Sequence, residues 1–242
     1  MKKVILLSGK ISSGKNQLGE YLKSNLESKG MSVTMDLFAK DLKDGCKDDF
    51  KKLANCLDNI VEELTAQVDV VFDNIHESKQ GNIQGLYKIL EKLRINDHNW
   101  YEDKTSITRN ILQLYGTEIF RNRVDNDWWP KQVLNRILKS DTDVTIVTDT
   151  RFPNEITVID DYKHKEFFET YAVRIERIIN TNKSISEHSS ETSLDDWTEW
   201  SYIVDNNGDL KNLEASAYNI VNDILDNNKE EIELDIKLEH IL

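Results

Sequence analysis

A glycine loop directly after a short apolar run is the feature that most restricts the fold of this chain. The run, Val4 to Leu7, is too short for a helix and has the composition of a buried strand. It leads at once into the segment Gly9-Lys10-Ile11-Ser12-Ser13-Gly14-Lys15-Asn16. Apolar positions at helical spacing then predict a helix from Asn16 to Lys29, which Gly30 stops. These residues therefore predict a strand, a glycine loop and a helix in succession.

This order of elements gives the loop the form of a phosphate-binding P-loop, G-x-x-x-x-G-K. Glycines let the backbone curl so that successive N–H groups point at phosphate oxygens, and the following helix adds its positive N-terminal end. We expect Lys15 to bridge the β- and γ-phosphates of a nucleoside triphosphate. The residues expected to hold ATP in this loop are Gly9, Lys10, Ser12, Ser13, Gly14, Lys15 and Asn16.

Asn16 is a departure from the usual loop, because a Ser or Thr that holds magnesium normally stands after the lysine. An amide oxygen can ligate Mg²⁺ or hold one of its waters. We therefore expect Mg²⁺ to enter with ATP, with Asn16 and, further along, Asp149 contacting the ion directly or through water.

Beyond the first helix the chain alternates predicted strands and helices, which implies a parallel sheet covered on both faces. The expected fold class is α/β, a P-loop NTPase three-layer fold with a parallel sheet and a helical insertion. The later strands are expected at Ser32–Met35, Val144–Val147, Tyr171–Ile175 and Tyr202–Val204, and the later helices at Ser106–Phe120 (interrupted at Gly116), Trp128–Leu138, from Pro153, and Leu210–Leu225, with a polar loop over 180–196.

The expected organisation is one domain over residues 1–227, with a core of 1–35 and 106–227 and a helical region of 36–105 inserted into it. Residues 228–242 form a C-terminal extension. In that extension Ile232, Leu234, Ile236 and Leu238 alternate with charged residues, which favours a strand, although a helix is also compatible. A lone strand needs a partner, so it would pair with a sheet edge or with a second subunit in a homodimer.

Composition excludes several kinds of partner. A net charge of −13 is unsuited to binding a nucleic acid polymer, yet a small phosphate ligand needs only a few basic groups in one pocket. No apolar window is long enough to span a bilayer, so no membrane partner is expected. The two cysteines, Cys46 and Cys56, and the five scattered histidines lack metal-ligand spacing, which suits a reduced cytoplasm and argues against zinc.

A second group of candidate residues follows the strand predicted at 144–147. Asp149, Thr150 and Arg151 come at its carboxyl end, with Glu155 shortly after. Because the carboxyl ends of parallel strands meet at one edge, we expect these residues beside the loop. The planar fork of arginine suits phosphate, and Asp149 would hold a magnesium-bound water or orient Arg151. The alternative is a surface helix pair between Arg151 and Glu155.

Arg109 lies on the helix that leads into Gly116, Thr117 and Glu118, and Trp129 opens the next helix. Taken singly, Arg109 would be a solvated helix charge and Trp129 a core aromatic.

Together these segments resemble the deoxynucleoside monophosphate kinases of bacteriophages and other large DNA viruses. The resemblance rests on the loop, on Arg109 before Gly116-Thr117-Glu118, on Trp129, on Asp149-Thr150-Arg151 with Glu155, and more weakly on Phe38 to Lys43 and His188 to Glu191. The family's aspartate after the loop lysine is Asn16 here, and the helical insertion matches poorly.

The resemblance implies transfer of a phosphoryl group from ATP to a deoxynucleoside 5′-monophosphate in the cytoplasm, the host's if the protein is viral. It gives Lys15, Arg109 and Arg151 catalytic roles and makes Arg177 a donor-side contact. The acceptor would be bound by Phe38, Ala39, Lys43, Gly116, Thr117, Trp129, Asp149, Arg151 and Glu155, with Trp129 beside the deoxyribose. A kinase of another small acceptor, such as dephospho-coenzyme A, and a P-loop nucleotide switch stay open as alternatives.

Overall fold

The computed structural model describes residues 1–46, 112–161, 166–178 and 189–239. The chain divides into two compact units, one formed by residues 1–39 with 127–242 and the other by residues 40–126. The first unit contains the sheet and the glycine loop. None of the helices in the described ranges is long and apolar enough to cross a membrane.

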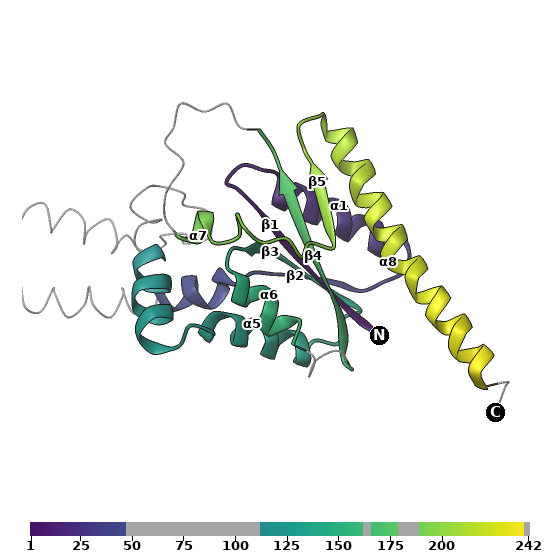
Figure 1. The fold of residues 1–242 in the computed structure, drawn as a ribbon, viewed down its shortest axis with the longest axis horizontal. Helices are drawn as coiled ribbons and strands as arrows, with labels where there is room; N and C mark the ends of the chain where they lie inside the picture. The colour runs from purple at the N-terminus through teal and green to yellow at the C-terminus, as the bar shows by residue number, and fades with distance from the viewer. Residues whose placement is uncertain (47–111, 162–165, 179–188, 240–242) are drawn as a thin grey trace, which may run out of the picture. The chain divides into compact units, whose positions relative to one another are not determined.

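The first unit is built on a five-stranded sheet in the order β2-β3-β1-β4-β5, in which every neighbouring pair is parallel (Figure 1). The strands are β1 (Lys2–Gly9), β2 (Val33–Asp36), β3 (Val144–Thr150), β4 (Phe168–Glu176) and β5 (Tyr202–Asp205). The central strand, β1, is apolar along most of its length because it has a neighbour on each side and helices on each face. Its carboxyl end therefore lies in the middle of the sheet edge, where ligands bind in this class of fold.

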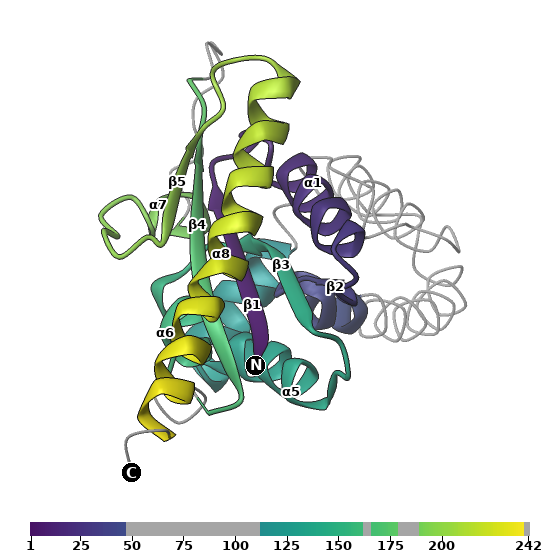
Figure 2. The same ribbon diagram turned by 90° about the vertical axis from the view of Figure 1, so that its right-hand side faces the viewer.

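Helices cover both faces of the sheet, which confirms the expected three-layer α/β fold (Figures 1 and 2). Because side chains alternate along a strand, Ile5 and Leu7 pack with α1 (Lys15–Ser28) and α8 (Leu210–Glu239). Val4 and Leu6 point the other way and pack with α5 (Trp128–Lys139) and α6 (Pro153–Ile159). The strands and helices predicted in this unit before residue 226 are confirmed, with ends that differ by a few residues, except that α8 continues past its predicted end at Leu225 to Glu239.

Two predictions in this unit are wrong. A short helix, α7 (Ser189–Thr192), lies inside the segment expected to be only a polar loop. The strand expected from Ile232 to Leu238 is instead part of α8, which runs without a break to Glu239. In this alternating pattern every second apolar residue is four positions from the first, which is also a helical spacing. A helix that has already formed on the core extends more readily than an isolated strand forms. Association with a second subunit stays a prediction, without that strand to support it.

In the second unit residues 40–46 are helical, and a π-helix, η2, spans Leu114–Val124. The interruption expected at Gly116 is wrong, because this glycine lies inside η2. It allows close packing, since a Cβ there would stand 2.9 Å from a methyl carbon of Leu42. Residues 47–105 of the predicted helical insertion, with Cys56, lie outside the described residues, as does Arg109 in the core segment that follows, so the proposed boundaries of the insertion stay a prediction.

Candidate active site

The glycine loop turns the chain from the end of β1 into the start of α1. Ser12 and Gly14 have positive φ angles of 60° and 102°. At Gly14 the left-handed backbone is combined with close packing, since an added Cβ would lie 2.4 Å from Nδ2 of Asn206. Glycine meets both demands because it has no side chain. This turn places the loop directly ahead of the N-terminus of α1, the position at which a helix favours a phosphate.

Asn206 supports the loop from the next part of the sheet edge, directly after β5. Its buried side chain donates from Nδ2 to the carbonyl oxygen of Ser13 at 2.8 Å. Its own backbone N–H donates to the carbonyl of Glu176, at the end of β4, at 2.8 Å. Sequence reasoning missed this residue, although a polar side chain directly after a predicted strand of a parallel sheet was a usable signal.

We expect Asn206→Ala to weaken both the fold and nucleotide binding. The substitution leaves the Ser13 carbonyl unsatisfied, which should lower the free energy of unfolding by about 1–3 kcal/mol and loosen the loop. Denaturant unfolding and ATP titration measure the two effects, with Asn219→Ala on the exposed face of α8 as control. Unchanged ATP affinity in Asn206→Ala would show that the loop keeps its shape without this support.

The side chain of Lys15, at the end of the loop, folds back onto the start of the loop. Its Nζ donates to the carbonyl oxygens of Gly9 at 2.7 Å and Lys10 at 2.8 Å. The pKa of Lys15 is lowered from 10.5 to about 8, mainly by burial and also by the positive charges of Arg151 and Arg174, which the negative charges of Glu191 and Asp149 partly offset. These residues therefore share one electrostatic neighbourhood, although they come from helices and strands far apart in the chain.

The lowered pKa of Lys15 predicts that ATP binding takes up a proton in alkaline solution. Above about pH 8 the free protein holds this lysine largely neutral. A bound polyphosphate favours the charged form and raises the pKa again, so a proton is absorbed on binding. Calorimetric titration at about pH 9, in buffers of different ionisation enthalpy, should show this uptake, and it should fade towards pH 7. The uptake should vanish in Lys15→Met; an equal uptake there would assign the proton to another group.

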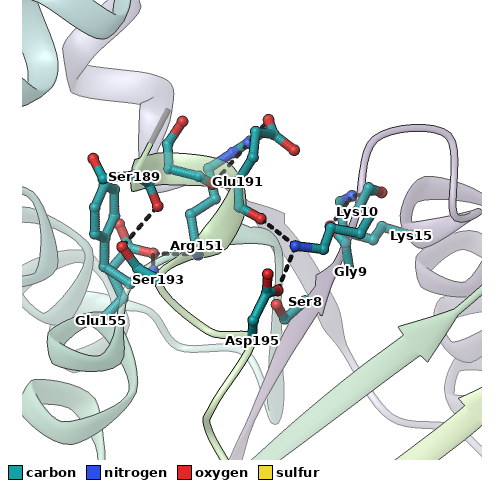
Figure 3. Close-up of polar contacts among 12 residues, drawn as sticks. Ser8, Gly9, Lys10, Lys15, Arg151, Glu155, Ser189, Glu191, Ser193 and Asp195 are labelled. Carbon is teal, nitrogen blue, oxygen red and sulfur yellow. Dashed lines mark hydrogen bonds and ion pairs between the residues drawn. The ribbon is translucent and has the colours of Figure 1, made fainter. Parts of the chain in front are cut away.

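Arg151 and Glu155 stand at the carboxyl end of β3, as expected, but their side chains do not form the helix pair considered above. The buried carboxylate of Glu155 accepts the backbone N–H groups of Arg151 at 2.6 Å and Phe152 at 3.1 Å, which fixes the start of α6. The guanidinium of Arg151 turns to α7, where it pairs with the Glu191 carboxylate and donates to the carbonyl of Ser190 at 3.2 Å (Figure 3).

Lys10 makes a parallel set of contacts with the same short segment. Its Nζ donates to the carbonyl oxygen of Glu191 at 2.6 Å and pairs with the carboxylate of Asp195 (Figure 3). Asp195 also lies 3.5 Å from a guanidinium nitrogen of Arg174, on β4. Residues 190–195 thus place oxygen atoms against three basic side chains beside the loop.

A small pocket opens between these groups at the carboxyl ends of β1, β3 and β4. Its lining is predominantly polar and consists of Ser8, Gly9, Thr150, Arg151, Arg174, Ser190, Glu191 and Leu194. Ser8 pairs with Thr150 on one side and with Arg174 on the other, so the pocket spans three adjacent strands. The two arginines that line it, next to a loop of the phosphate-binding form, favour an anionic group at this edge of the sheet.

Comparison with known proteins identifies the family of this chain. The model of the deoxynucleotide monophosphate kinase family matches residues 40–217. The chain belongs to this family. It is also 30% identical over 111 residues to the deoxynucleoside-5′-monophosphate kinase of Escherichia phage T5, a match that covers 46% of this chain and 44% of that protein. The chain thus matches less than half the length of this relative, and the resemblance inferred from sequence is confirmed at the level of the family.

Residues that the kinase family resemblance assigned to the acceptor lie in different surroundings. Asp149 accepts the backbone N–H groups of Phe38 at 2.7 Å and Ala39 at 3.0 Å, one on each carboxylate oxygen. Trp129 is 4% exposed, so most of its ring packs inside the protein. Lys43, Gly116 and Thr117 belong to the second unit, and Arg109 lies outside the described residues. Their roles toward an acceptor stay predictions.

On the donor side, Asn16 is exposed in the first turn of α1, and Arg177 is exposed just beyond the end of β4. Within the described ranges no group of three His, Cys, Asp or Glu side chains forms a metal cluster. Such a cluster is not required for Mg²⁺ in kinases, where the ion keeps several waters and is held by phosphates and one or two oxygen ligands. Asn16 and Asp149 fit that modest requirement.

Proposed function

We propose that this protein transfers the γ-phosphoryl group of ATP to a deoxynucleoside 5′-monophosphate. The observation that carries the proposal is the pocket beside the glycine loop, which Arg151 and Arg174 line while Lys15 lies in their electrostatic field. Membership of the deoxynucleotide monophosphate kinase family supports this acceptor class over others. The partners are accordingly small nucleotides, and the reaction would take place in cytoplasm.

The chemistry asks little of the protein beyond position and charge. An acceptor phosphate is already anionic near neutral pH, so one of its oxygens attacks the γ-phosphorus without a strong base. The bond from that phosphorus to the β-phosphate oxygen breaks, and ADP leaves with the electron pair. Lys15 would offset the charge that gathers on the β- and γ-oxygens, while the fork of Arg151 would hold a phosphate at a fixed angle.

Mg²⁺ bound with ATP would neutralise part of the phosphate charge. In this chain Asn16 offers an amide oxygen at the start of α1. Asp149 accepts one N–H on each oxygen and so retains lone pairs for a metal-bound water. These two residues are the candidates to hold the ion.

An ATP-coupled assay over the four common deoxynucleoside monophosphates, their ribose counterparts and dephospho-coenzyme A tests the proposal. We expect ADP to form in proportion to acceptor, with at least one deoxynucleotide far better than dephospho-coenzyme A. If Trp129 borders the sugar, the matching ribonucleotide should be used up to about a hundredfold less well, because an indole face offers the extra hydroxyl no partner.

Two outcomes would contradict the proposal. Transfer mainly to dephospho-coenzyme A would indicate a kinase of another small acceptor. ATP hydrolysis at the same slow rate with every acceptor would indicate a nucleotide switch.

A further inference from the structure

Arg174 is a charged residue on an interior strand of the sheet. Burying a charge there lowers the stability of the fold unless the charge is paired or hydrogen-bonded. It lies on β4 between Val173 and Ile175, both buried in the core. Its register partner on β1 is Ser8, the residue directly before the glycine loop, and a guanidinium nitrogen donates to the Ser8 hydroxyl at 3.3 Å. The side chain is 12% exposed, so it reaches the sheet edge while most of its surface stays covered.

The partners of Arg174 leave it available to an anion. Its carboxylate neighbour Asp195 is 3.5 Å away, is 42% exposed, and also pairs with Lys10. The other neighbour is Trp200, whose ring centre lies 5.6 Å from the guanidinium carbon. A contact of this kind with an aromatic ring uses none of the guanidinium's N–H groups as hydrogen-bond donors to an acceptor oxygen. One exposed carboxylate shared by two cations is a weak hold compared with a phosphate that accepts two hydrogen bonds.

The same pocket contains an unused donor. Thr150, at the end of β3, pairs in register with Ser8 of β1 on the side opposite Arg174. Thr150 is 1% exposed, and its hydroxyl has no hydrogen-bond partner among the described residues. Buried hydroxyl groups are nearly always paired, so an orphan that lines a polar pocket points to a ligand with acceptor oxygens. Thr150 and Arg174 belong to β3 and β4, the two strands beside β1, and both line the pocket.

We propose that Arg174 binds the terminal phosphate of the nucleotide donor, on the side of the pocket opposite Arg151. The proposal rests on the proposed function, since it assigns a residue of the same transfer site. Lys15 reaches the β- and γ-phosphates from the loop, Arg151 approaches from β3 and Arg174 from β4. The Asp195 carboxylate competes with the phosphate for this guanidinium, and phosphate oxygens replace it on binding.

The deciding experiment compares the binding of ATP and ADP, each with Mg²⁺ and without acceptor, to Arg174→Met. Loss of a hydrogen bond to a charged group predicts that the Kd for ATP rises about tenfold or more, while the Kd for ADP changes less than about twofold. Arg174→Lys keeps the charge and loses the fork, so it should show a smaller loss confined to ATP. If Arg174→Met fails to fold, Arg174→Lys carries the comparison. Equal losses for ATP and ADP, or no loss, would overturn the proposal.

A variant of its ion-pair partner, Asp195, distinguishes a purely structural role of Arg174 from phosphate binding. If the ion pair only braces residues 190–195, Asp195→Asn should weaken ATP binding as much as Arg174→Met does, and that result would overturn the proposal. We expect Asp195→Asn to bind ATP as well as the wild type or better, because it releases both Arg174 and Lys10. Lys139→Met, at the far end of α5 and exposed, is the matched control for the loss of one positive charge.

These binding measurements involve no acceptor. If no deoxynucleotide is phosphorylated but the difference between ATP and ADP persists, the proposed function fails and the assignment of Arg174 stands. If transfer occurs but ATP and ADP respond alike, the assignment fails and the function stands.

Discussion

Lys15→Ala is expected to reduce phosphoryl transfer by about a hundred- to a thousandfold or more, because it removes the loop cation expected to offset the charge that develops on the β- and γ-phosphate oxygens. Steady-state kinetics with the best acceptor measures the loss, which should fall mainly on kcat. Lys139→Ala, which removes an exposed lysine at the end of α5, is the control and should keep normal turnover. Near-normal turnover of Lys15→Ala would show that the glycine loop is not the donor site.

The stability of the same variant gives an independent check. The folded-state pKa of Lys15, about 8, lies below its ordinary value of 10.5, so the fold disfavours the charged form. Below about pH 8 the charged lysine therefore costs stability, and that cost disappears as the pH rises towards 10.5. Lys15→Ala without ligand should accordingly unfold no earlier than the wild type at pH 7. A Tm well below that of the wild type would mean that the kinetic loss reflects damage to the fold.

Arg151→Ala is expected to have the next largest effect, a loss of about ten- to a hundredfold in kcat/KM, since it removes a fork that grips phosphate. Arg151→Lys should recover only part of this, because lysine offers a point charge in place of two parallel donors. The measurement is transfer kinetics with varied acceptor and saturating ATP. Full activity of Arg151→Lys would indicate that only the charge matters at this position.

The ion pair of Arg151 with Glu191 supplies the matched control. If Arg151 serves only to hold α7, Glu191→Gln should lose as much activity as Arg151→Ala. A phosphate-binding Arg151 predicts that Glu191→Gln keeps most of its activity, because the guanidinium is released to the substrate. Equal losses in the two variants would assign the arginine to structure.

Two of these predictions rest on residues found from sequence, and the reason is that their requirements are local. The loop needs glycines at positions set by its own backbone, a lysine at its end, a strand before it and a helix after it, all within the first thirty residues. Arg151 was found because it follows a short apolar strand, and parallel strands bring their carboxyl ends to one edge.

The tail shows the limit of a local pattern. Alternation over Ile232 to Leu238 satisfies a strand, but the same residues also lie at helical spacing. The choice depends on what precedes them, and α8 is already anchored by Leu213, Ala217 and Ile224 in the core. Once such a helix exists, each further residue adds to it at little cost.

The sequence by itself determined the phosphate loop, the α/β class and the family, because each depends on spacing between residues close in the chain. Only the tertiary structure decided which residues meet there. Arg174, Asp195 and Asn206 follow the loop by more than 150 positions, yet they contact Ser8, Lys10 and Ser13 directly. Those contacts follow from the strand order β3-β1-β4-β5, which is selected by packing of the whole sheet between its helices. No periodicity within one segment contains that order, and so the partners of the loop could not be read from the chain alone.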